Sequence, residues 1–380
     1  MPSPRGVKSH PCLVINAGSS SVKFSVFDLA SGCTLLFKDE IERVDSIEKS
    51  LQRIPDMLAK AGHDNVKTIG HRVVHGGKEF SAPVIVTDSV MKKLEALIPL
   101  APLHQPYNLE AIQVFAKLHP DIPQIACFDT AFHYTQPRQS ELFALPRSYA
   151  EEGILRYGFH GLSYEYIASV LPEHLGEKAE GRVIVAHLGN GASMCAMKQR
   201  KSVATTMGFT ALDGLMMGTR CGNLDPGVVL YLLEEKGMTI EEVTTLLYKE
   251  SGLKGVSGIS GDMRDLLASN APEAKEAIDL FCYQAAKQLA GLIPALGGLD
   301  TIVFTAGIGE NSPAIRKNIC DRLSWLGVKL DDKANKNSQT SIHSKDKAIT
   351  IHVIPTDEER MIAQHVLNLF DCQGIYSYSN

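Results

Sequence analysis

One arrangement occurs twice in this sequence and limits what the chain can fold into. Residues 12–40 contain three apolar segments of strand length, CLVINAG, SVKFSVFDL and CTLLFKDEI, with a Gly turn and small polar residues after the first. Residues 182–207 repeat this order as RVIVAHLGNG, SMCAMKQ and SVATTMG. Apolar strands separated by short Gly-containing turns are typical of an antiparallel meander. The repeat therefore predicts two similar α/β halves, each beginning with a β-meander.

Segments whose apolar residues lie three and four positions apart follow both meanders and predict helices. One is NLEAIQVFAKL, with Asn108 as its expected N-cap, and another is AIDLFCYQAAKQLAGLI. We expect the boundary between the halves near residues 130–160. The last periodic segment, TDEERMIAQHVLNLF, either stays with the second half or crosses back onto the first. The sequence alone leaves that choice open.

Composition narrows the class of protein. A chain of 380 residues is long enough for two domains with separate cores. Its net charge of −5 argues against nucleic-acid binding, which normally needs a basic face. The sequence has no apolar run long enough to span a membrane, no recognisable signal peptide and no Cys-x-x-Cys pair among its eight cysteines. We expect a cytoplasmic protein with reduced, buried thiols and no membrane association.

Three stretches that follow apolar strands are candidate phosphate-binding loops: NAGSSSVK (16–23), HLGNGAS (187–193) and FTAGIGENS (304–312). Gly lets the backbone approach an anion and turn its N–H groups toward it. Any one of these loops alone is more often an ordinary tight turn. Three of them in one chain favour a nucleotide site, although the sequence has neither a Walker A motif nor a Rossmann fingerprint.

The third loop also predicts the start of a helix. Ser312 is placed to cap that helix, and Pro313 suits its first position. Ile315, Ile319 and Leu323 then form an apolar stripe.

Two arginines have the neighbours that a phosphorylated or carboxylate ligand requires. Arg72 and Val74 lie two apart on an expected strand and therefore share a face, which offers a guanidinium and a small apolar wall. Arg220 lies between Gly218 and Gly222, where it is either a surface charge or a phosphate clamp. The planar fork of Arg suits a charge-spread phosphoryl group. Asp129 follows an apolar strand, where its carboxylate either points at Mg²⁺ or an Arg of the site, or forms a structural ion pair.

These segments together resemble one family. NAGSSSVKF, GHRVVHGG, LAPLHQPYN, FDTAFH, YGFHG, HLGNGAS, MGTRCGNLDP, SGISGDMRDL and TAGIGENS occur in order through most of the chain and are similar to acetokinases, within the actin/Hsp70/sugar kinase superfamily. The resemblance implies Mg²⁺-dependent phosphoryl transfer between ATP and a short carboxylate, giving an acyl phosphate and ADP. It also implies a homodimer of chains with two ribonuclease H-like domains and an active site in the cleft between them. We expect residues 1–131 with 361–380 to form the N-terminal domain and residues 132–360 the C-terminal, nucleotide-binding domain.

The resemblance also assigns residues to the site. It implies catalytic roles for Asp129, Arg72, Arg220 and His160, and metal ligation by Asn16 and Glu358, with Mn²⁺ as an alternative to Mg²⁺. The acetate or acetyl phosphate site would comprise Arg72, Val74, Leu103, His104, Phe159 and Ala211. The ATP or ADP site would comprise Ser19, Ser21, Lys23, His187, Gly189, Asn190, Gly191, Asp262, Met263, Arg264, Gly307, Ile308, Gly309, Glu310 and Asn311.

The chain departs from the family pattern at four positions. Tyr164, Asn223 and Asp357 replace the usual His, Asp and Asn, and Ala211 replaces a Pro that is common in the acyl pocket. The acyl chain length is therefore open between acetate with propionate also accepted, and propionate as the main substrate. Two readings from other classes also stay open. They are a non-kinase ATPase of the same superfamily and an acyl-phosphate hydrolase that uses Asp129 and His160.

Overall fold

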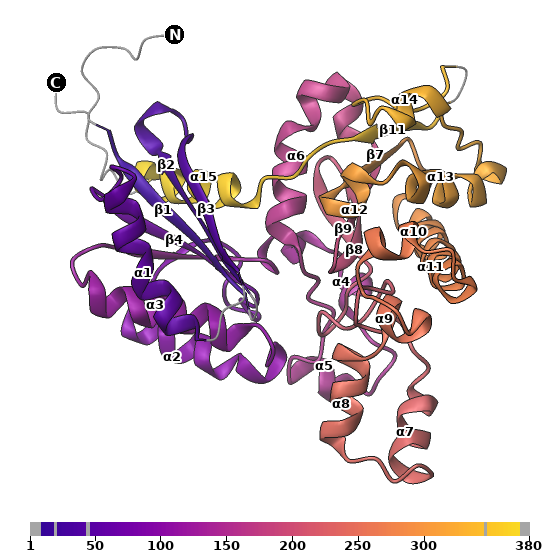
Figure 1. The fold of residues 1–380 in the computed structure, drawn as a ribbon, viewed down its shortest axis with the longest axis horizontal. Helices are drawn as coiled ribbons and strands as arrows, with labels where there is room; N and C mark the ends of the chain where they lie inside the picture. The colour runs from indigo at the N-terminus through magenta and orange to yellow at the C-terminus, as the bar shows by residue number, and fades with distance from the viewer. Residues whose placement is uncertain (1–8, 19–20, 43–45, 346–347, 373–380) are drawn as a thin grey trace. The chain divides into compact units, whose positions relative to one another are not determined.

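The structure is a computed structural model that describes residues 9–18, 21–42, 46–345 and 348–372. Its chain forms two compact units (Figure 1). Unit 1 comprises Met1–Phe132, Gly161–Tyr166 and Asp357–Asn380, and unit 2 comprises His133–His160 and Ile167–Thr356. The domain limits expected from the sequence stay a prediction, and they did not include the stretch 161–166 in the first unit.

Unit 1 is built on one mixed sheet in the order β3-β2-β1-β4-β6-β5. Strands β1, β2 and β3 form the antiparallel meander, β4 and β6 continue from β1 in parallel, and β5 pairs antiparallel to β6. The strand bounds are β1 (Pro11–Ala17), β2 (Ser21–Asp28), β3 (Thr34–Glu42), β4 (Thr68–Val73), β5 (Val84–Ile85) and β6 (Gln124–Phe128).

Unit 2 repeats this topology with the strand order β11-β10-β7-β8-β9. Again three strands form an antiparallel meander, and two more continue in parallel from its first strand. The bounds are β7 (Arg182–Leu188), β8 (Ala192–Lys198), β9 (Lys201–Thr205), β10 (Thr301–Thr305) and β11 (Thr350–Val353). The repeat in the sequence is thus a repeat of structure, and the prediction of two similar α/β halves is confirmed.

Helices cover both faces of the unit 1 sheet (Figure 1). Helices α1 (Ile47–Lys60) and α3 (Gln105–Leu118) pack on one face, with α2 (Asp88–Ala96) beside α3, and α15 (Glu358–Cys372) packs on the other. Gly70 of β4 makes the contact with α15 close, because a Cβ there would lie 2.6 Å from Ile362 Cγ2. The last helix therefore belongs to the first half of the chain, which answers the question that the sequence left open.

Unit 2 holds most of the remaining helices, and α11 runs along its sheet against β7, β8 and β9. Helix α6 begins in the stretch 161–166 of unit 1 and continues in unit 2. The bounds are α4 (Arg138–Glu141), α5 (Arg147–Glu151), α6 (Gly161–Leu175), α7 (Pro226–Glu234), α8 (Ile240–Lys249), α9 (Gly252–Ser257), α10 (Met263–Ala268), α11 (Pro272–Leu296), α12 (Ala306–Asn311), α13 (Pro313–Arg322) and α14 (Asp332–Lys336).

One of the two expected helix caps is wrong, and the other is confirmed in position only. Helix α3 begins at Gln105, so Asn108 lies inside it and is buried. Its amide instead accepts a hydrogen bond from Val74 N at 3.0 Å and donates to Ala17 O at 2.9 Å. Ser312 does precede α13, but its side chain makes no capping bond. The stripe of Ile315, Ile319 and Leu323 is buried, as predicted.

Most cysteines of the described chain are buried, as the sequence predicted. Seven cysteines carry free thiols in the part of the chain that the structure describes, and all of them except Cys221 are buried. Among the described helices, none is both long and apolar enough to cross a bilayer.

Candidate active site

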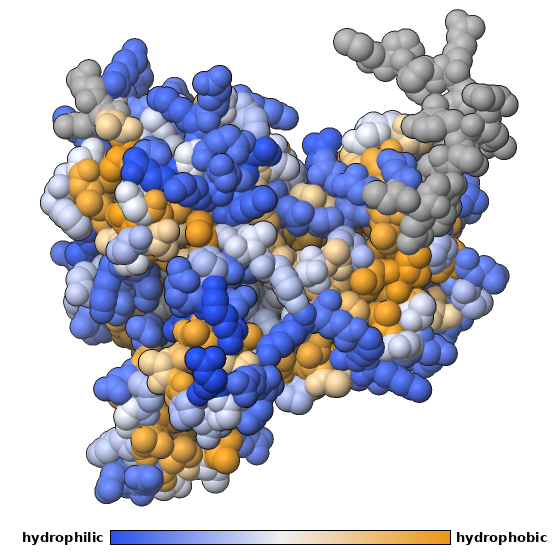
Figure 2. All heavy atoms as spheres, turned by 180° about the vertical axis from the view of Figure 1, so that it is seen from behind, coloured by the Kyte–Doolittle hydropathy of each residue, from blue (hydrophilic) through white to orange (hydrophobic). Residues whose placement is uncertain are grey.

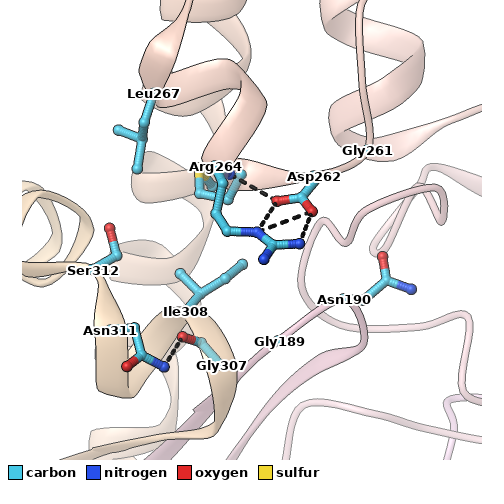
Figure 3. Close-up of a pocket in the computed structure, with 11 residues that line it drawn as sticks. Gly189, Asn190, Gly261, Asp262, Arg264, Leu267, Gly307, Ile308, Asn311 and Ser312 are labelled. Atoms are coloured by element: carbon cyan, nitrogen blue, oxygen red, sulfur yellow. Dashed lines mark hydrogen bonds and ion pairs between the residues drawn. The ribbon is translucent and has the colours of Figure 1, made fainter.

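A cavity of about 490 Å³ in unit 2 is the first part of the candidate site (Figure 3). Three segments line it: the turn between β7 and β8, the start of α10, and α12 with the residue after it. Its lining includes Gly189, Asn190, Asp262, Met263, Arg264, Gly307, Ile308 and Asn311, all of them predicted nucleotide-binding residues. Gly261, Leu267 and Ser312 also line it but were not assigned to the nucleotide site, although Gly261 and Ser312 lie inside the predicted motifs SGISGDMRDL and FTAGIGENS.

Arg264 and Asp262 form an exposed pair at this cavity. The Asp262 carboxylate caps α10 by accepting from Arg264 N at 2.8 Å and is bound by the guanidinium, with Nη2 at 2.6 Å. Hydrogen bonds from the Arg264 side chain and then from its backbone hold the pKa of Asp262 below its usual value. The Arg264 side chain is 89% exposed and lies between Asp262 and Ile308 (Figure 3). A flat, exposed guanidinium beside an apolar side chain suits a planar aromatic base.

The Gly turn between β7 and β8 joins this cavity to a second group of residues. A Cβ at Gly191 would lie 2.8 Å from Arg220 Nη2 and 3.2 Å from His160 Nε2, so both side chains lie against its backbone. Arg220 Nη1 also donates to Ala211 O at 2.6 Å. Glycine at position 191 is thus what allows a guanidinium and an imidazole to approach the same turn.

His160 is held in an unusual conformation. Its φ of 58° is left-handed, which is uncommon for a residue other than Gly, although His adopts this conformation more often than most residues do. Its Nδ1 lies 2.8 Å from Ser193 Oγ, and its ring stacks on that of His187 at 4.2 Å between centroids. Strain of this kind persists where the surroundings fix a residue, and it is common at functional sites. Ser193 ends the predicted loop HLGNGAS, but no role was assigned to it, because its contact with His160 joins residues 33 positions apart.

Unit 1 contains a third group, centred on Arg72 at the end of β4. Arg72 Nη2 lies 2.6 Å from Asp129 Oδ2, and Nε lies 3.1 Å from both oxygens of that buried carboxylate. Asn16 Oδ1 accepts from Nη1 at 3.2 Å, and Glu358 Oε2 lies 3.9 Å from Nε. Burial alone would lower the pKa of Arg72, but Asp129 and then Glu358 outweigh it and raise the pKa, so the guanidinium stays charged.

Two buried side-chain amides bind the backbone N–H groups of the residues that follow Arg72. Val74 N donates to Asn108, and His75 N donates to Gln105 Oε1 at 3.1 Å. Val74 is buried, while Leu103 and His104, which lie just before α3, are half-buried. These three predicted acyl-site residues belong to unit 1, whereas Phe159, which is buried, and Ala211 belong to unit 2.

Several predicted nucleotide-binding residues do not line the cavity. Ser21 and Lys23 belong to β2 in unit 1, where Lys23 Nζ lies 4.0 Å from Glu40. Glu310 turns its carboxylate toward Ala306 N, at 2.7 Å, and Gly309, in the same helix α12, faces Phe304 and Ala186 of the sheet. His187 and Gly191 belong to the group around His160. Ser19 lies outside the described residues, and the roles of all these residues stay predictions.

The chain is similar to known proteins over most of its length. A profile described as the acetokinase family matches residues 38–364. The chain belongs to the acetokinase family. An acetate kinase of Rhodopseudomonas palustris is 52% identical over 94% of this chain and 98% of its own length, and an acetate kinase of Methylocella silvestris is 49% identical over the same shares.

Solved structures agree with this assignment. A propionate kinase from Francisella tularensis superposes with a TM-score of 0.88 at 39% identity and covers 94% of this chain and 98% of that one. An acetate kinase from Porphyromonas gingivalis superposes with a TM-score of 0.86 at 34% identity and covers 95% of this chain and all of that one. The two α/β units, whose sheets share one order of five strands with β5 added at the edge in unit 1, are therefore the fold of acetokinases.

Proposed function

We propose that this chain is an acetate kinase that transfers a phosphoryl group reversibly between ATP and acetate. The observation that carries this proposal is the turn at Gly189–Gly191. On one side the turn lines a cavity of a size suited to a nucleoside, and on the other it contacts Arg220 and His160. A nucleotide whose base occupies the cavity would direct its phosphates along the turn toward those two side chains.

The residues provide what phosphoryl transfer needs. The transition state spreads charge over three equatorial oxygens, so fixed donors and positive charge stabilise it. Arg220 would clamp these oxygens, and His160 would donate a hydrogen bond to them. A general base is unnecessary, because a carboxylate acceptor is already ionised at neutral pH. Arg72 would bind that carboxylate, and Asp129 would hold the guanidinium in place.

A divalent cation, Mg²⁺ with Mn²⁺ as an alternative, would be held by Asn16 and Glu358. The side-chain oxygens of both residues already approach one positive group, the guanidinium of Arg72. Hard oxygen donors in small number suit Mg²⁺, which keeps several waters and binds substrate phosphates. The bound cation would neutralise charge on the phosphate oxygens.

Propionate is the second candidate substrate, because position 211 is Ala. Replacing Pro by Ala takes about two carbons from one wall of the expected acyl pocket, and one methylene is worth only about 0.8 kcal/mol of burial. The backbone there is tied to Arg220 through the Ala211 carbonyl, so a smaller side chain widens the pocket while the clamp stays in place.

A homodimer formed through unit 2 is part of this proposal. Helices α7 and α8 form a projection with orange apolar patches, at the lower left of Figure 2. Leu230 is 55% exposed, Tyr231 51% and Ile240 78%. Exposed apolar groups gathered on one projection are typical of protein–protein contacts, and a second copy of this chain is the expected partner.

The deciding experiment measures ADP release from ATP with no acid and with acetate, propionate or butyrate. It also measures ATP formation from acetyl phosphate and ADP. We expect turnover to require a carboxylate, kcat/KM for propionate to lie within about tenfold of that for acetate, and butyrate to be poor. Ala211→Pro should lose propionate activity more than acetate activity. Turnover without any acid would indicate a non-kinase ATPase, and acetyl phosphate cleavage without ATP formation would indicate a hydrolase.

A further inference from the structure

Helix α12 forms one wall of the nucleotide cavity and is too short to be stable without support from other segments. It supplies Gly307, Ile308 and Asn311 to the lining but is only six residues long. A helix of this length has too few internal hydrogen bonds to be stable alone. It also begins at Ala306, whose φ of 66° is unfavourable for a residue with a Cβ. Its position must therefore be fixed by groups outside the cavity.

Arg316 of α13 fixes the C-terminal end of α12. It is among the largest fully buried side chains of the described chain, with 0% exposure. Nη1 donates to the carbonyl oxygens of Gly309 at 2.8 Å and Glu310 at 2.9 Å. Nε donates to Asn335 Oδ1 at 2.8 Å, and Nη2 donates to Asn335 O at 2.8 Å and Ser338 Oγ at 3.0 Å. Each of these acceptors is neutral, and burial lowers the pKa of Arg316 to about 10.

Glu310 fixes the N-terminal end of the same helix. Its Oε1 accepts from Ala306 N at 2.7 Å, from Thr305 Oγ1 at 3.4 Å and from Thr356 N at 3.1 Å. The carboxylate thus binds the N–H of the strained residue that opens α12. A negative charge is also favourable at a helix N-terminus.

We propose that Arg316 and Glu310 are positioning residues that clamp α12 from its two ends as a preformed wall of the nucleotide cavity. Burying a guanidinium without a carboxylate partner is costly, and an apolar residue would serve a core better. The planar fork repays that cost only by fixing several acceptors in one geometry. The acceptors that it fixes on α12 are the carbonyls of Gly309 and Glu310, which lie in the sequence between the lining residues Ile308 and Asn311. This inference rests on the proposed nucleotide-binding role of the cavity.

The test measures nucleotide affinity directly. Kd for ADP is determined by titration calorimetry, together with kcat and the KM values for ATP and acetate, in Arg316→Met, Arg316→Lys and Arg322→Met. Arg316→Met should raise Kd for ADP and KM for ATP by about tenfold or more and leave KM for acetate within about twofold. Arg316→Lys should raise Kd for ADP and KM for ATP by a similar factor, because Lys keeps the charge but cannot bind several acceptors at once as the planar guanidinium does. Arg322→Met is the matched control, since it removes a partly exposed guanidinium from the same helix.

A second pair of variants keeps the test informative if Arg316→Met does not fold. Glu310→Gln retains an acceptor for Ala306 N, whereas Glu310→Ala removes it, so the Ala variant should bind ADP more weakly than the Gln variant. ADP binding within about twofold of the parent in folded Arg316→Met, or in Glu310→Ala, would overturn the clamp. A parent that binds ADP but has no carboxylate-dependent turnover would refute the proposed activity and leave the clamp testable. A parent that does not bind ADP would refute both.

Discussion

At the scale of single residues, the site depends on where the backbone leaves room for charged side chains. Gly191 admits Arg220 and His160 to one turn because a Cβ there would approach both closely. The sequence predicted these residues through motifs that resemble those of acetokinases. It could not predict the inward turn of Glu310 or the part played by Ser193. Ser193 contacts His160, which is 33 residues away, and Glu310 accepts from Thr356 N, 46 residues away, as well as from the nearby Ala306 N.

Arg220 provides the residue-scale prediction. Arg220→Ala should lower kcat by about 10³-fold, the usual cost of removing a donor that acts on transition-state charge. Arg220→Lys should recover little, because a single ammonium cannot bind two oxygens side by side. Steady-state kinetics with ATP and acetate measure both effects. Arg200→Ala is the control, since it removes an exposed arginine that pairs with Glu180. Near-parental turnover in Arg220→Ala would remove this residue from the reaction.

At the scale of elements, short-range patterns predicted most strands and long helices, whereas caps and contacts between elements were missed. The strands of the two meanders are short apolar segments separated by Gly-containing turns, and they were predicted at nearly their observed limits. The Gly-rich stretch 304–312 was expected to be a loop but contains α12, because its helical turn depends on Glu310 and Arg316. Asn108 has the residue type of a cap but faces inward, where its amide joins Val74 to Ala17.

The packing of α15 on β4 provides the element-scale prediction. In Gly70→Ala the new Cβ would lie 2.6 Å from Ile362 Cγ2 and 3.1 Å from Val366 Cγ2, so the helix must shift. Such overpacking should destabilise the protein by about 1–3 kcal/mol. Gly291→Ala is the matched control, because Gly291 lies within α11 and a Cβ there meets no atom within 4 Å. That variant should be stabilised by roughly 0.5–1 kcal/mol. Urea midpoints that move in the same direction for both variants would contradict this account of the contact.

At the scale of the whole molecule, the duplicated topology was predictable because each half carries its own periodic pattern. The return of α15 to unit 1 was not, because an amphipathic helix shows that it has a buried face but not which sheet covers it. The sequence also could not distinguish buried structural histidines from histidines of the site. His71 in unit 1 and His133 in unit 2 lie at 1% and 2% exposure, yet their sequence contexts resemble those of the candidate site histidines.

These buried histidines predict how the stability of the molecule depends on pH. Burial lowers the pKa of His71 and of His133 to about 4, although hydrogen bonds with Gln124 and with Phe159 O act in the opposite direction. An unfolded histidine titrates near about 6.5, so between these two values the unfolded chain binds more protons than the folded one. The free energy of unfolding should therefore be insensitive to these groups above about pH 7 and fall as the pH drops toward 4. The slope is about 1.4 kcal/mol per pH unit for each such histidine.

His71→Gln, which can still pair with Gln124, should lose about 1 kcal/mol less of its free energy of unfolding than the parent does between about pH 7.5 and 5.5. His174→Gln, at an exposed position, should behave like the parent. Urea unfolding at the two pH values measures the difference, and an equal loss in parent and His71→Gln would mean that His71 accepts a proton without unfolding.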